Sequence, residues 1–600
     1  MWFKRKKDYN IYFEDVLSDN FGSKNVLSDT FDKTIKMRIS NNSIYFIVSI
    51  VFAFSMFVVY RAYSFQILDY QVYKNKSLNN NFVAVPIPSV RGSISDVRGE
   101  FLAKTVKINS EEIDGFKRVY TEKEGFGNIL GFVSYPKKDL SGKFWQDNFE
   151  GVEGLELYYN QLLSGKSGVR LYEKNASGAK RDSFVSENPL NGKDIKVSID
   201  GELQEFIYKK TKEFVEKNNL DGASGAIMDI ETGSLLSLVS YPTYDSNLLL
   251  PRDEDFIVST TTEISRNEYY KKLTEDKRKP FLNRPISGAY APGSIVKPLF
   301  ALAALNTNTI DPNTSIFSSG KIEVQSSLPG GKPAIFRDWK AHGYTNIAEA
   351  IAVSSDVFFY SVVGGYGGQK GTGIKVIDEY SKSFGFADTT GVDLYGEKTG
   401  NIPTPEWKQK IFSEDWRLGD TYNSSIGQFG FTATPIAMTR IIAAIANSGY
   451  LVTPKILVEN SSNIKQKVNI EIPEKWYELV RKGMRMAVTN GTATNLNLPY
   501  VKIAAKTGTA EIGNTKSYVH TWITGFFPYE KPKYAFVFIA EKGSRDKPKN
   551  PSAIMRQTFD WMLVNRPEYL GIDKEAAKIK IEEATTSAEN INTNDAGETR

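Results

Sequence analysis

A serine and a lysine three residues apart, Ser294 and Lys297, have the types and spacing of a nucleophile and its base. Pro292 and Gly293 interrupt the chain just before them, and the apolar run 295–305 predicts a buried helix with Ser294 in its first turn. Residues three apart share a helix face, so a desolvated, neutral lysine can take the serine proton. The helix N-terminus adds N–H donors that suit an oxyanion. The pair predicts acyl transfer, but Ser-x-x-Lys alone occurs by chance on many helices.

A second hydroxyl opens another apolar run further along the chain. Ser354 and Asp356 belong to the segment Ser-Ser-Asp-Val-Phe-Phe-Tyr, which lies inside a predicted helix at 346–364. A hydroxyl at Ser354 could relay a proton to a leaving amine.

A third polar group follows the apolar segment 501–505, which predicts a strand. Lys506, Thr507 and Thr509 offer a cation and two hydroxyls to a substrate carboxylate, and Gly508 allows close backbone approach. The three motifs are individually weak but strong in combination. Ser-x-x-Lys, a Ser-x-Asp variant of Ser-Asp-Asn, and Lys-Thr-Gly in this order are typical of penicillin-binding proteins and class A β-lactamases.

The elements that must position these groups alternate in type along the chain. Segment 225–240 predicts a β-hairpin around a Glu-Thr-Gly turn. Periodic apolar residues predict helices at 294–306, 346–364 and 434–447, and further strands follow. This order indicates an α+β domain.

The first seventy residues indicate a membrane anchor. Residues 44–60 carry no charge, and the apolar character resumes after Arg61 as far as Leu68, which is enough to cross a bilayer. Some forty residues precede this run and no clear Ala-x-Ala site follows it, which disfavours a cleaved signal peptide. Basic residues before the run predict a cytoplasmic tail at 1–43 and a catalytic domain outside the cytoplasm.

Composition excludes several classes of function. The 600 residues carry a net charge of only +5 without a long basic block, so nucleic-acid binding is not expected. The absence of cysteine excludes disulfides, thiol nucleophiles and cysteine-ligated zinc. Residues 69–190 predict an irregular β-rich module without catalytic character. The segment 566–600 is expected to be disordered, because residues from Lys574 onward lack aromatic side chains and are mostly polar.

The chain resembles class B penicillin-binding proteins, which are monofunctional peptidoglycan DD-transpeptidases, and most closely those of the elongation type. The resemblance extends from the membrane span to about residue 560. It rests on the three motifs together with the segments Arg91–Asp96, Ser240–Asp245, Gly427–Gln428, Thr432–Pro435 and His520–Pro528. It implies a pedestal, or dimerisation, domain at 69–190 and a transpeptidase domain with the serine β-lactamase-like fold at 191–565.

The resemblance also implies roles for the motif residues. Ser294 would attack the penultimate D-alanyl carbonyl of a stem pentapeptide, with Lys297 as the base. Ser354 and Lys506 would pass protons to the leaving amine. The substrate would be held by Asp356, which replaces the amide of other relatives, and by Thr507, Gly508 and Thr509. Because a carboxylate only accepts hydrogen bonds, whereas an amide also donates, the role of Asp356 is open.

Partners and alternatives follow from the same resemblance. No cofactor is implied, and β-lactams are expected to acylate the enzyme. A pedestal without chemistry, and no recognisable glycan polymerase in the chain, imply a SEDS-family polymerase and other elongation-complex proteins as partners, with exposed pedestal positions such as Arg98 contacting them. A DD-carboxypeptidase, a β-lactamase, and a non-catalytic membrane-bound β-lactam sensor or scaffold remain alternatives.

A metal site is not expected, although two residues are weak candidates. Some elongation-type relatives bind zinc through two aspartates, a histidine and a cysteine. Only Asp338 and His342 match that pattern here, and Ser355 stands at the position of the cysteine. A serine hydroxyl is a poor zinc ligand. The other histidine, His520, is expected to be packed or hydrogen-bonded.

Overall fold

The structure, a computed structural model, describes residues 41–582 except 73, 75–81, 110–113, 141–143, 175–179, 251–264, 326–330, 459–464 and 514. The chain separates into two compact units. The first contains residues up to 83 and 173–181, and the second contains 84–172 and the chain from 182 onward. Most of the predicted cytoplasmic tail and the last eighteen residues, 583–600, lie outside the described residues.

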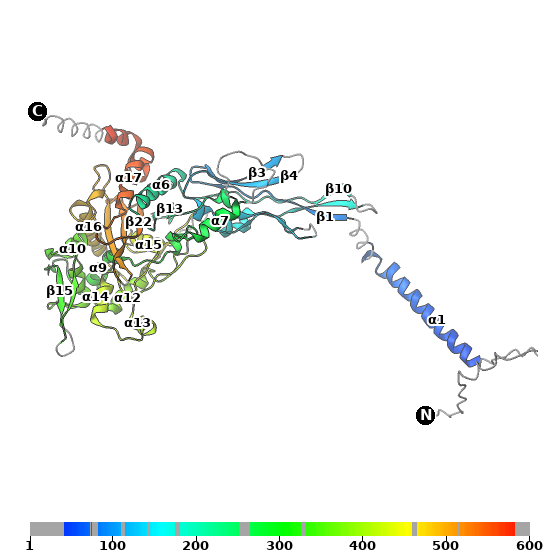
Figure 1. Cartoon of the computed structure of the whole chain (residues 1–600), viewed down its shortest axis with the longest axis horizontal. Coiled ribbons are helices and arrows are strands. Elements are labelled where there is room, and N and C mark those ends of the chain that lie inside the picture. The colour runs from blue at the N-terminus through cyan, green and yellow to red at the C-terminus, as the bar shows by residue number, and fades with distance from the viewer. Residues whose placement is uncertain are drawn as a thin grey trace, which may run out of the picture. The chain divides into compact units, whose positions relative to one another are not determined.

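The first unit contains the predicted membrane helix. Helix α1 spans Asn41–Tyr63 and continues into a π-helical turn, η2, at Ser64–Leu68 (Figure 1). Among the described residues, 44–68 is the only helix long and apolar enough to cross a membrane, and none of it is buried. Its 25 residues would extend for roughly 37 Å, which exceeds a hydrocarbon core of about 30 Å.

A five-stranded antiparallel sheet lies at the centre of the second unit, with strand order β13-β12-β22-β21-β20. Its strands are β12 (Gly222–Asp229), β13 (Leu235–Tyr241), β20 (Ala504–Ile512), β21 (Tyr518–Phe527) and β22 (Tyr534–Ser544). The first two are the predicted hairpin. Strand β20 is an edge strand, so one side of its backbone has no neighbouring strand among the described residues.

Helices cover both faces of this sheet (Figure 1). The main covering helices are α6 (Gly201–Lys217), α9 (Lys297–Asn306), α15 (Pro435–Ala446), α16 (Glu474–Thr489) and α17 (Ser552–Asn565). Consecutive residues of β22 point to opposite faces: Phe536 and Phe538 pack with α6 and α17, whereas Val537 and Ile539 pack in the cluster that contains α9 and α15. Because both faces are covered, β22 is a continuous apolar run rather than an alternating one.

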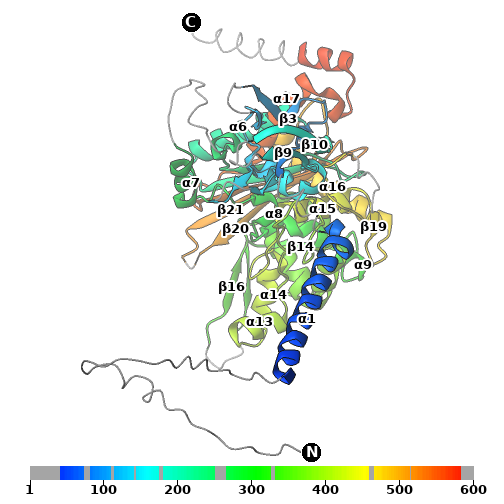
Figure 2. The same cartoon turned by 90° about the vertical axis from the view of Figure 1, so that its right-hand side faces the viewer.

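A second group of elements carries the far wall of the cleft described below. Its helices are α10 (Ile347–Val353), α11 (Asp356–Phe359), the π-helical turn η5 (Tyr360–Gly364), α12 (Ile374–Ser383), α13 (Pro405–Phe412) and α14 (Leu418–Ser425). Its short strands are β14 (Ile316–Ser318), β15 (Lys321–Val324), β16 (Ala334–Arg337) and β17 (Gly343–Thr345). Figure 2 shows β16 below β20 and β21 in that view.

Three predicted elements differ in detail from the structure. The helix predicted at 294–306 begins as a 3-10 turn, η4, at Gly293–Val296, and the α-helix starts only at Lys297. The helix predicted at 346–364 is broken at Ser354, whose φ is 60°, and Ser355 caps the next helix by accepting from Phe358 N. Strand β20 starts at Ala504 and therefore includes the Lys-Thr-Gly motif, which the sequence placed after the strand. The helix predicted at 434–447 is confirmed as α15.

Three strands of a four-stranded sheet of order β11-β2-β3-β4 lie within residues 69–190, where the pedestal is predicted. The strands of this sheet are β2 (Ile94–Ser95), β3 (Phe101–Asn109), β4 (Asp114–Tyr120) and β11 (Ile195–Lys196), and the neighbouring helices are α3 (Gly127–Leu130), α4 (Gly154–Tyr158) and α5 (Asn160–Leu163). A further sheet has the order β1-β9-β10, with bounds Phe82–Ile87, Gly168–Lys174 and Lys180–Glu187. Beneath the first sheet, Glu156 accepts from Arg91 Nε at 2.6 Å and from Arg118 Nε at 2.7 Å, and all three side chains are fully buried.

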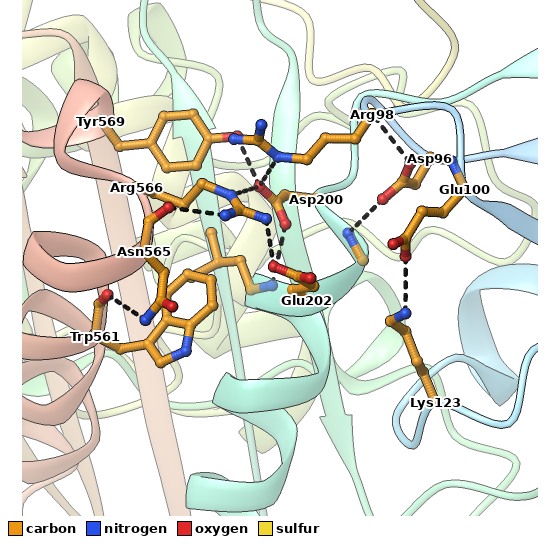
Figure 3. A network of polar contacts seen from close by, with 12 residues as sticks. Asp96, Arg98, Glu100, Lys123, Asp200, Glu202, Trp561, Asn565, Arg566 and Tyr569 are labelled. Carbon is orange, nitrogen blue, oxygen red and sulfur yellow. Dashed lines mark hydrogen bonds and ion pairs between the residues drawn. The ribbon is translucent and has the colours of Figure 1, made fainter. Parts of the chain in front are cut away.

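A polar network joins the pedestal to the start of α6 and the end of α17 (Figure 3). Asp200 Oδ2 accepts from Arg98 Nε at 3.2 Å, Arg566 Nε at 2.8 Å and the Tyr569 hydroxyl at 3.0 Å. Arg98 Nη2 also donates to Glu568 Oε1 at 2.8 Å. Arg98 is exposed, as expected, but its guanidinium group is also part of a junction within the chain.

The same network corrects the expected disordered tail. Residues 567–570 form a 3-10 turn, η7 (Pro567–Leu570), and 574–582 are helical. Leu570 and Ala577 are buried in the cluster beneath α6 and α17. The polar composition after residue 573 hid the burial of Ala577, so the prediction of disorder is wrong for residues 566–582. Residues 583–600 lie outside the described part of the chain.

Candidate active site

Ser294 lies in a tight turn that two glycines make possible. Gly293 has a φ of 57°, and a Cβ at this position would lie 2.6 Å from the carbonyl oxygen of Thr509. Its N–H donates to the carbonyl of Gly427 at 3.1 Å. Gly427 has a φ of 73°, and its own Cβ would lie 2.3 Å from the Gly293 oxygen. The close approach of these backbones holds Ser294 beside β20, because neither position has room for a side chain.

Lys297 is fully buried, and its ammonium group points to the break between α10 and α11. Its Nζ donates to the Ser354 carbonyl at 2.8 Å and forms an ion pair with Asp356 Oδ1 at 2.6 Å. The Ser354 hydroxyl is 3.4 Å away. Ser294 lines the cleft described below, whereas Lys297 is buried and makes its hydrogen bonds to Ser354 and Asp356 of the Ser-x-Asp motif.

Lys506 approaches the same hydroxyl from β20. Its Nζ is 2.8 Å from Ser354 Oγ and 2.7 Å from the carbonyl oxygen of Thr507, and its side chain is buried. Burial lowers the pKa of Lys506 well below its ordinary value, the charge of Lys297 lowers it further, and Asp356 opposes the shift. Ser354 is therefore a hydroxyl shared by two lysines, as a proton relay requires.

Asp356 has a different environment from the one expected. It was predicted to hold the substrate, but its carboxylate is the counter-ion of Lys297. Burial raises the pKa of Asp356, and the positive charge of Lys297 opposes that shift. The carboxylate lines the cleft with its side chain 18% exposed, so a substrate could still reach it.

The cleft has a volume of about 1020 Å³, and residues of all three motifs line it. Thr507, Gly508 and Thr509 form its β20 wall. The Thr507 hydroxyl donates to Thr492 Oγ1 at 2.7 Å, and the Thr509 side chain is exposed. A Cβ at Gly508 would lie 2.8 Å from a methyl carbon of Ile295, so this glycine is required for packing against the Ser294 turn.

Asp338 and His342 lie together but supply only two of the ligands that a zinc site needs. Asp338 Oδ2 accepts from Ser355 Oγ at 2.9 Å and from Val357 N at 3.0 Å, and Oδ1 accepts from Trp339 N at 2.9 Å. The carboxylate is thus already occupied in positioning the Ser-x-Asp segment. His342 Nε2 lies 3.4 Å from Asp338 Oδ1, and burial lowers the pKa of this histidine although Asp338 opposes the shift. No group of three metal-ligating side chains occurs among the described residues.

His520 has a structural role. It lies on β21, where Nδ1 accepts from Lys542 N at 3.2 Å, and its ring meets that of Tyr290 edge to face at 5.3 Å between centroids. Burial lowers its pKa, which keeps the ring neutral so that it can accept this hydrogen bond. The prediction of a packed, hydrogen-bonded residue is confirmed.

Sequence reasoning missed several residues that line the cleft. These are Arg337, Asn423, Phe429, Thr492, Glu511, Lys516 and Arg545. They come from separate helices, strands and loops, and none of them belongs to a motif with fixed spacing. Only the alternation of β20, which places Glu511 on the same face as Thr507 and Thr509, could have indicated one of them.

A serine in a tight turn, two buried lysines and a hydroxyl that both lysines approach beside an edge strand are the arrangement expected of a serine acyltransferase of α+β architecture. The penicillin-binding protein transpeptidase domain model matches residues 223–560, and the penicillin-binding protein dimerisation domain model matches residues 111–197. The chain therefore belongs to the penicillin-binding protein transpeptidase family, as the sequence motifs predicted.

Curated relatives and solved structures agree with this membership. The peptidoglycan D,D-transpeptidase MrdA of Escherichia coli is 31% identical over 531 residues, which cover 82% of this chain and 78% of that protein. MrdA of Haemophilus influenzae is 32% identical over 490 residues, 75% of this chain and 70% of the relative. Penicillin-binding protein 2 of Helicobacter pylori, in complex with MreC, has a TM-score of 0.65 and 27% identity, and the match covers 80% of this chain and 98% of that one.

These matches confirm the function predicted from the sequence at the level of activity and cellular role. The chain is a peptidoglycan D,D-transpeptidase of the elongation type, and the carboxypeptidase, β-lactamase and sensor alternatives are not favoured.

Proposed function

We propose that Ser294 is the residue that this transpeptidase acylates, and that Lys297, Ser354 and Lys506 move the protons. The observation that carries the proposal is the convergence of both buried lysines on the Ser354 hydroxyl, in the same cleft as Ser294. Ser294 would attack the penultimate D-alanyl carbonyl of a stem pentapeptide, or the carbonyl of a β-lactam, and form an ester. An amine of a second stem would then displace the enzyme and complete the cross-link.

The proton route begins at Lys297, which the Ser354 carbonyl at 2.8 Å and the Asp356 carboxylate at 2.6 Å hold in place. Lys297 acts as the base in its neutral form. Neutral Lys297 then takes the proton of Ser294 during the attack. The ammonium group of Lys297 then passes this proton through the Ser354 hydroxyl to the leaving nitrogen, so that D-alanine leaves with a neutral amino group.

The remaining predicted residues hold the terminal carboxylate. Lys506 supplies the cation, and Thr507 and Thr509 supply hydroxyls from the accessible face of β20. The N–H groups of Ser294 and Thr509 would form the oxyanion hole.

Intact-mass measurement after treatment with benzylpenicillin tests the assignment of the nucleophile. The wild-type protein should gain one covalent adduct, and Ser294→Ala should gain none. Ser287→Ala is a matched control, because this exposed hydroxyl donates to the Gly396 carbonyl and does not line the cleft. An adduct on Ser294→Ala, mapped by peptide mass to another serine, would overturn the proposal.

We also infer that the catalytic domain lies outside the cytoplasm and that the protein works with a SEDS-family glycan polymerase and other elongation proteins. The apolar helix, the basic residues before it and the Helicobacter complex with MreC support this inference. Because the chain has no native cysteine, Ser18→Cys and Ser186→Cys can be labelled separately in intact cells with an impermeant thiol reagent. Only the exposed pedestal position Ser186 should react. Labelling at position 18 alone would contradict this membrane orientation and place the catalytic domain in the cytoplasm.

Co-purification from detergent-solubilised membranes tests the partner. Full-length protein should retain the polymerase, and a variant with residues 44–68 replaced by an unrelated span should lose it. Equal retention by both proteins would contradict a role for this anchor in binding the polymerase.

A further inference from the structure

One end of the catalytic cleft carries a charged cluster to which the transpeptidation chemistry assigns no role. Glu511, on β20, binds Lys516 through Oε2 at 3.0 Å and Arg545 through Oε1 at 2.9 Å. Arg337, on β16, is exposed in the same cleft and forms no ion pair with any described residue. We call Arg337, Glu511, Lys516 and Arg545 the rim cluster. All four line the cavity that contains Ser294.

The position of Glu511 along β20 relates the rim cluster to the substrate. Thr507, Thr509 and Glu511 alternate with the buried residues Gly508 and Ala510, so the three share the accessible face of the strand. Strand β20 is an edge strand, and an extended peptide can lie along its free side.

The register of such a peptide follows from the carboxylate site, and this step rests on the proposed roles of Ser294 and the Lys-Thr-Gly motif. With the terminal residue beside Thr507 and the preceding residue, which carries the reacting carbonyl, beside Gly508, the stem runs antiparallel to β20. Both chains advance by about 3.3 Å per residue, so the third residue of the stem lies beside Thr509, and a long side chain on it can extend the roughly 7 Å along the strand to Glu511.

The charges of the rim cluster select the chemistry of that third residue. Three cations surround one carboxylate, so a side chain that ends in an amine alone meets more repulsion than attraction. A side chain that ends in both an amine and a carboxylate can place its ammonium on Glu511 and its carboxylate on Arg545 or Lys516. The side chains of Lys516 and Arg545 are 63% and 54% exposed, and such exposed pairs hold their partners weakly, so they can exchange them for a ligand.

We propose that the rim cluster is a specificity subsite for a donor stem whose third residue ends in an amino acid group, such as diaminopimelic acid, in preference to lysine. Glu511 receives the ammonium group, and Arg545 with Lys516 receives the carboxylate. Arg337 adds positive charge from the opposite wall and disfavours an end that is only cationic.

Acylation of the full-length protein in detergent by modified penicillins tests this subsite. Penicillin N carries an acyl arm that ends in an α-amino acid and imitates the proposed side chain. It is compared with its N-acetyl derivative, its decarboxylated derivative and benzylpenicillin, each competing with a fluorescent penicillin. Penicillin N should acylate about 3- to 10-fold faster than either of its derivatives, as expected for charge-assisted contacts weakened by solvent.

Variants then separate the two halves of the subsite. Glu511→Gln should abolish the preference over the N-acetyl derivative, and the double variant Lys516→Gln with Arg545→Gln should abolish the preference over the decarboxylated one. Glu530→Gln is the control, because Glu530 forms an exposed pair with Lys502 outside the cleft and its loss should leave both preferences intact. Benzylpenicillin should acylate every variant at nearly the wild-type rate.

Three results would overturn the subsite: no preference in the wild type, preferences that persist in the variants, or equal slowing of all four penicillins by the variants. The last result would make the rim cluster structural. Failure of benzylpenicillin to acylate the wild-type protein would instead refute the proposed function on which the register rests.

Discussion

The junction at Asp200 yields a quantitative prediction about stability. The Asp200 side chain is fully buried, whereas its partners Arg98 and Arg566 are 41% and 11% exposed. Its Oδ1 also accepts from Leu203 N at 3.2 Å as the N-cap of α6. Removal of one member of a buried ion pair costs about 3–5 kcal/mol, because the remaining charge loses its compensation. We therefore expect Asp200→Ala to lower the free energy of unfolding by about 3–5 kcal/mol.

Arg98→Ala provides the comparison within the same network. Because more than a third of Arg98 is in solvent, its loss should cost less than about 1 kcal/mol. Urea unfolding of the full-length protein can be followed by tryptophan fluorescence, since Trp561 stacks on Phe206 with 5.4 Å between ring centroids and lies beside Arg566. The penicillin-labelling rate of the folded variants should match that of the wild type, because Asp200 does not line the cleft.

The pH dependence supplies an independent check. Burial alone would raise the pKa of Asp200, but hydrogen bonds from Arg566, Leu203 N and Tyr569 and the charge of Arg566 outweigh it, so the pKa lies below its ordinary value. A carboxyl group with a lowered pKa stabilises the fold above its unfolded pKa of about 3.9, and that stability is lost as the pH falls through the folded pKa. The stability difference between wild type and Asp200→Asn should therefore shrink below about pH 4. A loss in Asp200→Ala no larger than that in Arg98→Ala would refute this reasoning, as would a difference independent of pH.

Three further predictions concern the cleft. Gly293→Ala should slow fluorescent-penicillin labelling at least about tenfold, because its Cβ would meet the Thr509 carbonyl at 2.6 Å; labelling at the wild-type rate would contradict the turn geometry. The acylation rate of Asp356→Asn should lie within a few-fold of the wild-type rate. Asp356→Leu should be acylated far more slowly, because it leaves the Lys297 side chain without its partner. Equal rates for all three proteins would contradict a role for this side chain. Because the pKa of Lys506 is lowered, its ammonium group loses its proton at a lower pH than that of an ordinary lysine, so the acylation rate with carboxylate-bearing β-lactams should fall at that lower pH. Arginine stays charged, so the acylation rate of Lys506→Arg should not fall as the pH rises.

The sequence alone determined the membrane helix, the α+β class and the three motifs. These features are local: an uncharged apolar run, the alternation and periodicity of apolar residues, and fixed spacings such as that between Ser294 and Lys297. The hairpin at β12 and β13 and helix α15 follow from the same local signals, since turn glycines and a Thr-Pro start are specified by neighbouring residues.

Only the tertiary structure decided which polar groups meet. The partner of Lys297 proved to be Asp356, which no local pattern could show, because the ion pair depends on the break of the helix at Ser354. Asp200 joins Arg98 to Arg566 across 468 positions (566 − 98), and the rim cluster comes from three separate segments. Electrostatic contacts between distant segments have no sequence period, so their partners become visible only when packing of the apolar faces has fixed the distances between them.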